Sequence, residues 1–277
     1  MKRDDATGRR KGFAGFACAA ASCLLLAIAA GGAGHAQTSG AGAGANDQKA
    51  RAILDQMVAA LGGQRWLTLQ NSTLVGRTSG FYQGKPTGDI SDYTQITQYP
   101  GQTRIEIGKK RNVVEIFTGN EGWEVTYRGK GRIPADQVAD FVRRRDHSIE
   151  IAVRVWLKDP KTILIYGGQQ MVERHLADQV ILINAENDSI EIETDVQSHL
   201  PLRRSWQWRD PVYKDKNTDA EEYDDYHVID GIPTPFDVTR YHNGDMTNQR
   251  FLYRAAYDTA LPPETFDPDA TAAKIKK

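Results

Sequence analysis

Histidines are the residues of this chain whose chemistry could most readily support catalysis or metal binding. Beyond residue 36 they stand singly among charged neighbours, as His147, His175, His199, His227 and His242. The chain contains no HExxH metal-protease motif, no GxSxG nucleophile elbow and no Gly-rich phosphate loop. A catalytic triad needs a nucleophile, a base and an orienting acid, so isolated histidines indicate solvated or strand-edge positions. The sequence therefore predicts no catalytic residues, no metal and no cofactor.

The segment DKNTD at residues 215–219 resembles the start of a calcium-binding loop. That loop requires a glycine at its turn and a bidentate glutamate at its end, but Ala220 and Tyr226 occupy these positions. We expect no calcium there. The acidic residues that follow are expected to form a solvated loop and the start of a strand: Glu221, Glu222, Asp224 and Asp225.

Three consecutive arginines, Arg143–Arg145, follow a helical pattern. Cations are favourable at the C-terminus of a helix because they compensate its dipole, and we interpret the arginines in this way. The alternative is that they attract an anionic lipid head group or a partner protein.

Tryptophans in strand-like segments offer large apolar area, either for an ordinary core or for the wall of a cavity that binds acyl chains. Trp206 and Trp208 lie two residues apart and are predicted to share one face of a strand with Leu202 and Arg204. We expect Trp123 to be largely buried and to face the helices that cover the sheet. The full set of candidate cavity residues is Trp123, Val125, Leu202, Arg204, Trp206, Trp208, Phe236 and Val238.

Arg204 is the charged member of this set. An unpaired cation on an apolar face must reach the rim or meet an anion, because its burial alone costs too much free energy. Arg204 is therefore expected near the mouth of the cavity, where the polar head of an acyl chain could lie. The alternative is that it pairs with a carboxylate of a neighbouring strand, such as Glu191 or Glu193.

The surrounding segments predict a mainly antiparallel α+β fold. A helix is expected to begin with a cap at Asn46 or Asp47 and to end at Gly62, and one or two more are expected between Pro134 and Asp159. In SIEIETD, at residues 189–195, apolar and acidic residues alternate, which indicates a sheet with one buried face and one wet face. Strands are expected at residues 72–82, 92–99, 103–107, 112–118, 122–128, 162–167, 179–186, 189–195, 202–209, 222–230 and 247–257, with a further one in 230–245.

That further strand lies in DGIPTPFDVTRYHNGD, residues 230–245. Pro233 and Pro235 cannot donate backbone hydrogen bonds, which predicts that they stand at the beginning of a strand or on an edge. Asn243-Gly244 is typical of a type I′ hairpin turn. We interpret the two prolines as a device that sets strand register.

The N-terminus is typical of an export signal. A basic segment precedes an apolar stretch at residues 13–30, and Gly34-His35-Ala36 predicts cleavage after Ala36. Residues 1–36 are then the signal, 37–46 a flexible linker, 47–270 one β-rich domain and 271–277 a tail. Cys18 and Cys23 both lie in the signal, so we expect no disulfide in the exported chain. The net charge of −1, without a basic stripe, argues against nucleic acid as a partner, and we expect a monomer.

The order of segments resembles the LolA-like superfamily of periplasmic lipoprotein carriers, which includes RseB-type sensors. The resemblance rests on QYPGQTRIE (residues 98–106), TGNEGWEVTY (118–127), the LPL turn (200–202) and FDP (266–268), with a helical region between the second and third of these. It covers most of residues 47–270. It implies an unclosed half β-barrel whose concave apolar face is covered by helices and receives lipid acyl chains.

Three functional hypotheses follow. The first is a periplasmic, non-catalytic binding protein for lipid or lipoprotein acyl chains, which would exchange them with a membrane-anchored delivery partner. The second is a lipid-responsive envelope-stress sensor domain that regulates a partner. The third, a secreted enzyme, lacks a recognisable nucleophile–base pair or metal cluster in the sequence.

Overall fold

The computed structural model describes residues 39–88, 90–110 and 112–275. The expected signal, its cleavage point after Ala36 and both cysteines lie outside these ranges. Within the described ranges, no helix combines the length and the apolar character that a membrane crossing requires.

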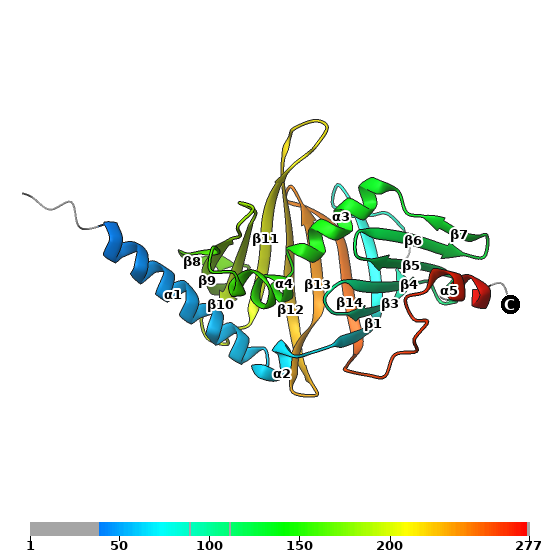
Figure 1. The fold of residues 1–277 in the computed structure, drawn as a ribbon, viewed down its shortest axis with the longest axis horizontal. Helices are drawn as coiled ribbons and strands as arrows, with labels where there is room; N and C mark the ends of the chain where they lie inside the picture. Colours follow the sequence, from blue (N-terminus) through cyan, green and yellow to red (C-terminus); the bar gives the residue numbers. More distant parts are fainter. Residues whose placement is uncertain (1–38, 89, 111, 276–277) are drawn as a thin grey trace, which may run out of the picture. The chain divides into compact units, whose positions relative to one another are not determined.

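The described residues form one antiparallel sheet of 14 strands, two more than the segments expected (Figure 1). Its two edges, β7 and β8, do not pair with each other, so the sheet is not closed into a barrel, which confirms the predicted fold class. The short β2 (Lys85–Pro86) pairs with β1. Side by side, the other strands are β7 (Gly129–Arg132), β6 (Glu121–Thr126), β5 (Val113–Thr118), β4 (Gln102–Ile107), β3 (Ser91–Gln98), β1 (Asn71–Tyr82), β14 (Asp245–Tyr257), β13 (Ile232–His242), β12 (Lys216–Ile229), β11 (Pro201–Arg209), β10 (Ser189–Asp195), β9 (His175–Ile183) and β8 (Ile163–Val172).

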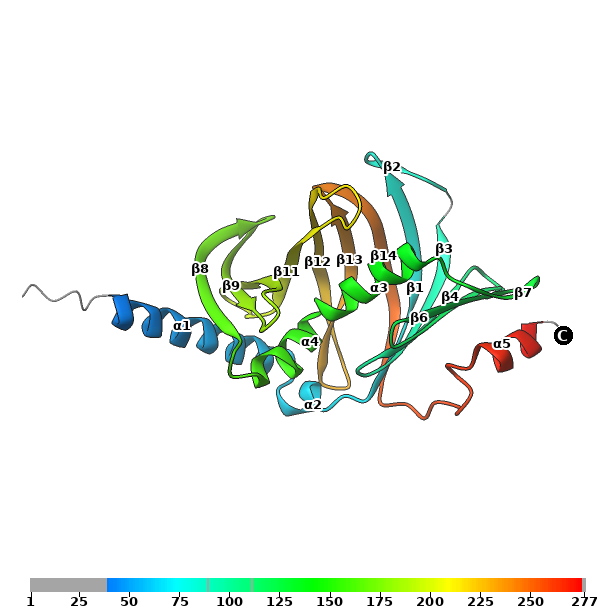
Figure 2. The same ribbon diagram turned by 45° about the horizontal axis from the view of Figure 1, so that its top comes forward.

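The two edge strands are consecutive in the chain, so the segment that joins them has to cross the sheet. It does so as α3 (Ala135–Asp146) and α4 (Ile149–Arg154), as Figure 2 shows, and these are followed by the short 3-10 helix η1 (Trp156–Lys158). These helices confirm the prediction for residues 134–159. We call the sheet face that they cross the inner face and the opposite one the outer face. The other helices are α1 (Ser39–Ala60), α2 (Gln64–Leu67) and α5 (Pro268–Ile275).

Strand β10 shows the predicted alternation. Ile190 and Ile192 are fully buried on the inner face, and Glu191 and Glu193 point to the outer face. Glu193 nevertheless has an exposed fraction of only 1%, and its Oε1 accepts a hydrogen bond from Gln170 Nε2 at 2.9 Å. The outer face is therefore not uniformly wet.

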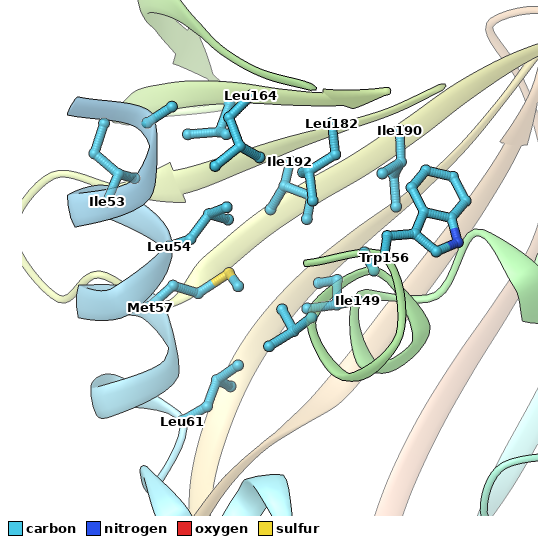
Figure 3. Packing of buried hydrophobic residues seen from close by; sticks show 14 of the residues in the cluster. Ile53, Leu54, Met57, Leu61, Ile149, Trp156, Leu164, Leu182, Ile190 and Ile192 are labelled. Atoms are coloured by element: carbon cyan, nitrogen blue, oxygen red, sulfur yellow. The ribbon is translucent and has the colours of Figure 1, made fainter. Parts of the chain in front are cut away.

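Helix α1 packs its apolar side against the inner face of β8, β9 and β10 (Figure 3). Ile53, Leu54, Met57 and Leu61, at spacings of three and four residues, are buried there. They contribute to one core, which includes Ile149 and Trp156 of the crossing segment and Leu164, Val180, Leu182, Ile190 and Ile192 of the sheet. The same core thus fixes α1, α4 and one part of the sheet.

Met57→Ala is expected to lower the free energy of unfolding by about 2–5 kcal/mol, because Met57 is fully buried and the truncation leaves a cavity. Asp55→Ala is the matched control. Asp55 faces solvent on the same helix and forms a 3.8 Å pair with Arg51, so its loss is expected to change stability by less than about 1 kcal/mol. Urea unfolding of both variants measures the difference. Equal effects would show that α1 does not depend on this contact.

Helix α1 begins at Ser39, inside the segment expected to be a linker, and not at Asn46 or Asp47. The side chain of Asn46 has a different role from the expected cap. Its Nδ2 donates to the backbone oxygen of Tyr166 at 3.2 Å, and its Oδ1 accepts from the Tyr166 backbone N–H at 2.7 Å. Asn46 therefore fixes α1 to β8. Because its side chain bonds to a strand and not to the first turn of the helix, it does not mark the start of the helix.

The two prolines of β13 lie where no backbone N–H is needed for strand pairing. Pro233 and Pro235 pair with β12, but β14 pairs with β13 only from Asp237 onward. The prolines thus lie where β13 has a neighbour on one side only, as on an edge, in agreement with the prediction. Asn243 and Gly244 both have positive φ, 51° and 87°, as a type I′ turn requires.

The calcium-like segment is part of a strand. Residues 216–229 form β12, and Asp219 accepts hydrogen bonds from Trp208 Nε1 at 2.7 Å and from the ring of His242, also at 2.7 Å. No group of metal-binding side chains occurs among the described residues. The expectation that Glu221 is solvated is wrong, because Glu221 has an exposed fraction of 4%.

Candidate functional site

A cavity of about 780 Å³ lies between the inner face of the sheet and the crossing helices α3 and α4. Two groups of apolar side chains line it. One group comes from the ends of α1 and α2, from α4 and from β13, and includes Leu61, Trp66, Leu69, Ile149, Ile151 and Ile232. The other comes from β4, β5 and α3, and includes Ile105, Ile107, Phe117, Ile133 and Phe141.

Helix α3 is attached to the sheet at its two ends, and the first attachment is apolar. The rings of Phe117 in β5 and Phe141 in α3 stack with centroids 3.7 Å apart and planes inclined by 7°. Nearby, a Cβ at Gly122 would lie 2.8 Å from Val138 Cγ2, so only glycine permits this close approach.

The second attachment is polar and uses Arg204 of β11. Its Nη1 donates to the backbone oxygen of Arg144 at 3.2 Å and to that of His147. Carbonyl groups at a helix C-terminus have no partner inside the helix, so a cation satisfies them well. Arg204 therefore holds the α3–α4 junction against the sheet.

Arg204 also belongs to a charged cluster on the cavity wall. In the register of three strands, Arg204 lies opposite Glu221, and Glu221 lies opposite Arg240. Glu221 Oε2 accepts from Arg204 Nη2 at 2.8 Å, and Oε1 accepts from Arg240 Nε at 2.6 Å. Arg250 Nη2 of β14 lies 3.5 Å from the same Oε1. One carboxylate thus faces three guanidinium groups.

This arrangement perturbs the ionisation of its members. Burial alone would raise the pKa of Glu221, but the charges of Arg204, Arg240 and Arg250 outweigh it and hold that pKa well below the usual range. Burial, together with the nearby charge of Arg250, lowers the pKa of Arg240 to about 10. All three arginines therefore remain protonated at neutral pH.

Several tyrosine hydroxyls lie around the cluster. Tyr223 donates to Glu221 Oε2 at 3.2 Å, and Tyr226 donates to the backbone oxygen of Pro201 at 2.8 Å. Burial raises the pKa of Tyr257 to about 12, and the hydroxyl of Tyr257 shares a 2.6 Å hydrogen bond with that of Thr234. These groups are neutral hydrogen-bonding partners at physiological pH.

Two of the eight candidate residues, Arg204 and Val238, line this cavity. The placement of Arg204 near a mouth is wrong, since its exposed fraction is 5%. Its partner is indeed a carboxylate of a neighbouring strand, but it is Glu221 and neither Glu191 nor Glu193. The latter two point to the outer face, because Ile192 is the residue opposite Arg204.

Trp206 and Trp208 share the inner face as predicted, but α3 and the turn after it cover them. The ring of Trp206 is 2% exposed and stacks on His147 with centroids 5.3 Å apart. The guanidinium of Arg143 lies 3.5 Å above the ring of Trp208. Trp206 is therefore buried under the crossing segment, Trp208 is partly buried beside it, and neither tryptophan lines the cavity.

Trp123 and Val125 lie on the outer face, which corrects the expectation for both. Val125 is buried with Val114 and Ile116 against α5, to which residues 271–275 of the expected tail belong. Trp123 is only partly buried, and Arg132 covers its ring at 3.8 Å from the centroid. The alternation of β5 and β6 turns Phe117 and Gly122 inward instead.

Leu202 and Phe236 leave the cavity wall because the period of two is interrupted beside each of them. At Leu202 the register between β10 and β11 shifts, so the strand alternation changes there. Phe236 packs against the ring of His227, with centroids 4.4 Å apart. In β12, Asp224 pairs with Asp237 and Tyr226 pairs with Pro235. Asp225, which lies between them and opposite Phe236, has a φ of +52°.

Nothing in the local sequence marks Arg240, Arg250 and Glu221 as a unit. In the sequence they appear only as charged residues at alternate positions of three strands. Such a pattern looks the same whether that face of the strand points inward or is exposed to solvent. The three strands are neighbours in the sheet, and pairing rather than spacing along the chain brings the charges together.

Arg143–Arg145 lie in the last turn of α3, as expected for cations that compensate a helix dipole. Arg143 and Arg144 pair with Asp140 at 3.2 Å and 2.6 Å, and Arg145 donates to the backbone oxygen of Gly119 at 2.6 Å. All three therefore have partners within the chain.

The described residues that line the cavity include no histidine. His147 contacts Trp206 on the covered part of the inner face. His175, His227 and His242 each pair with one aspartate: Asp195, Asp225 and Asp219, respectively.

Comparisons with known proteins concern the fold. No family model matches the chain, and no curated protein does either. Among solved structures, an outer membrane lipoprotein-sorting protein domain from Vibrio parahaemolyticus superposes with a TM-score of 0.56 at 10% identity. The match covers 82% of this chain and 100% of that one.

A DUF1329 family protein from Desulfovibrio piger superposes with a TM-score of 0.54 at 14% identity, over 80% of this chain and 98% of that one. A LolA superfamily protein from Nitrosomonas europaea is similar at 11% identity and a TM-score of 0.49, over 80% and 98% of the two chains. The sheet topology and the first two superpositions show that the chain has the unclosed, helix-covered sheet that its resemblance to LolA-like carriers predicted.

Proposed function

We propose that this protein is an exported, non-catalytic binding protein that holds the acyl chain of a lipid or lipoprotein in the cavity under α3 and α4. The cavity carries this proposal. Its volume of about 780 Å³ lies within the range of about 300–1,000 Å³ typical of small-molecule sites, and apolar side chains line it from both sides of the cluster. The export signal expected from the sequence and the LolA-like fold support a periplasmic location.

The chemistry around the cavity supports binding more than catalysis. The polar groups that line it are mainly arginines, carboxylates and protonated tyrosines, and no histidine is among the described lining residues. Burial and the nearby Glu124 raise the pKa of one lining carboxyl group, that of Glu115, but no nucleophile–base pair accompanies it among the described residues. Apolar walls with a few fixed polar groups are the usual composition of a site that holds an amphipathic ligand.

Ile105→Trp is expected to weaken binding of a neutral fluorescent probe, N-phenyl-1-naphthylamine, by about tenfold or more. A large ring at a cavity-lining position removes volume that the ligand needs. Gln102→Trp is the matched control, because residue 102 lies in the same strand on the other face. Circular dichroism establishes that both variants fold. Wild-type affinity in Ile105→Trp would place the ligand elsewhere.

Mass spectrometry of organic extracts from the purified protein provides the direct test. The protein is produced from the full-length chain and isolated from the cell envelope fraction. Co-purification of acyl lipids supports the proposal, and the same lipids are expected at lower amounts with Ile105→Trp. If wild-type protein neither carries lipid nor binds the probe, acyl-chain binding is excluded.

A further inference from the structure

The charged cluster on the cavity wall holds more positive than negative charge. Three guanidinium groups, those of Arg204, Arg240 and Arg250, surround the carboxylate of Glu221. Glu150 also lines the cavity and is the other carboxylate whose charge acts on Arg204. Even with both carboxylates ionised, the group has a net charge of +1. Arg144 adds nothing further because it pairs with Asp140 at 2.6 Å.

The arginines differ in how well they are satisfied. Arg204 has short contacts on both terminal nitrogens, to Glu221 and to two helix carbonyls. Arg250 has only long contacts among the described residues. Its Nη1 lies 3.4 Å from Tyr93 Oη, its Nη2 lies 3.5 Å from Glu221 Oε1, and its buried Nε has no hydrogen-bond partner. The exposed fraction of Arg250 is 8%.

The terminal nitrogens of Arg240 are also poorly satisfied. Its Nε donates to Glu221, and its terminal nitrogens make no hydrogen bond to any described residue. Both Arg240 and Arg250 line the cavity, next to the apolar Val238 and Leu252. Two planar donors of like charge therefore line the space where a ligand would lie. For Arg250, which is buried, the lack of a full set of partners costs free energy, whereas Arg240 is partly exposed.

We propose that Arg240 and Arg250 form a head-group site, and that the ligand is a single-chain or multi-chain lipid with an anionic carboxylate or phosphate head. Guanidinium groups match both anions because their parallel N–H donors form charge-assisted pairs. The head is placed between Arg240 and Arg250, and the chain extends along the apolar walls. This assignment rests on the acyl-chain binding proposed above.

The test compares three ligands of equal chain length at pH 8: palmitic acid, its methyl ester and hexadecyl phosphate. Each displaces the neutral probe N-phenyl-1-naphthylamine from wild-type protein. We expect at least one anion to bind about tenfold or more tightly than the ester, since a charge-assisted pair is lost with the ester. The preferred anion identifies the head as carboxylate or phosphate.

Arg240→Gln and Arg250→Gln are each expected to remove most of this preference while the affinity for the ester stays within about twofold, because the apolar walls are unchanged. Arg254→Gln, at an exposed position of the same strand as Arg250, is the control and is expected to keep the wild-type preference. Arg240→Lys retains the charge and is expected to retain part of the preference.

The wild-type comparison does not depend on the variants being folded. Equal affinity of all three ligands would overturn the head-group site and leave acyl-chain binding intact. If none of the three ligands displaces the probe, the head-group site is wrong, and if in addition no lipid co-purifies with the protein, acyl-chain binding is excluded as well. If the anions are preferred but the preference survives in both arginine variants, the anion binds elsewhere and the assignment to Arg240 and Arg250 is wrong.

Discussion

Glu221→Gln is expected to lower the free energy of unfolding by about 3–5 kcal/mol, because removal of one partner from a buried ion pair leaves the other charge uncompensated. Here three buried or partly buried guanidinium groups lose their shared anion, although the new side chain has nearly the same shape. Chemical denaturation at pH 7 measures the change.

Glu222→Gln is the control for this prediction. Glu222 is the next residue of β12, points to the other face and lies 3.9 Å from Arg203. The loss of a pair at this distance is expected to change stability by less than about 1 kcal/mol. The double variant Glu221→Gln, Arg240→Gln is expected to be more stable than Glu221→Gln alone, because it removes one of the orphaned charges. Equal stability of the two single variants would contradict this account.

The same cluster has a defined pH dependence. The folded-state pKa of Glu221 is depressed, so its contribution to stability is present above the unfolded value of about 4.5. That contribution is lost as the pH falls from there through the folded-state pKa. Between pH 5 and 8 the contribution of Glu221 is constant, so a change of stability in this range must come from another group.

Glu193→Gln is expected to stabilise the protein increasingly as the pH rises from about 5 to 8. Burial raises the pKa of Glu193 from 4.5 to about 7, despite the opposing charge of Arg203. A raised folded-state pKa means that the stabilising contribution is complete below the unfolded pKa and is lost as the pH rises through 7. A neutral glutamine avoids that loss, which amounts to about 2–4 kcal/mol over the full titration.

Melting temperatures of wild type and variant at several pH values between 5 and 8 test this prediction. Their difference is expected to grow from pH 5 to about 7, where the folded carboxyl group titrates, and to level off above that pH. Glu186→Gln, in the exposed turn before β10, is the control and is expected to follow the wild-type curve. A constant difference between wild type and Glu193→Gln would mean that the carboxylate is ionised throughout the range.

The elements of this fold could be predicted largely from local sequence. The helix at the N-terminus of the domain has its apolar residues at spacings of three and four. The strands contain β-branched and aromatic residues between glycine, proline and asparagine turns. Pro233 and Pro235 even predicted that part of a strand would pair on one side only, because proline has no backbone N–H to donate to a neighbouring strand.

The faces of the strands were harder to assign, and the reasons lie at particular residues. The period of two holds in β10, where Ile190 and Ile192 point inward. It is interrupted at Leu202 by a register shift and beside Phe236 by the positive φ of Asp225. Trp123 has an apolar side chain on a regular strand, but both faces of that strand are covered, by α3 and by α5. Hydrophobicity alone therefore could not identify the inner one.

By itself, the sequence determined the strands, the crossing helical segment and the absence of recognisable catalytic motifs, because these depend on neighbours within a few residues. The cavity and its charge were decided by tertiary structure. Arg204, Glu221, Arg240 and Arg250 come from four different strands, and strand register brings three guanidinium groups to one carboxylate. A charge in an alternating strand has the same local pattern whether its face meets water or a helix, and the crossing of α3 and α4 from β7 to β8 made this face an interior.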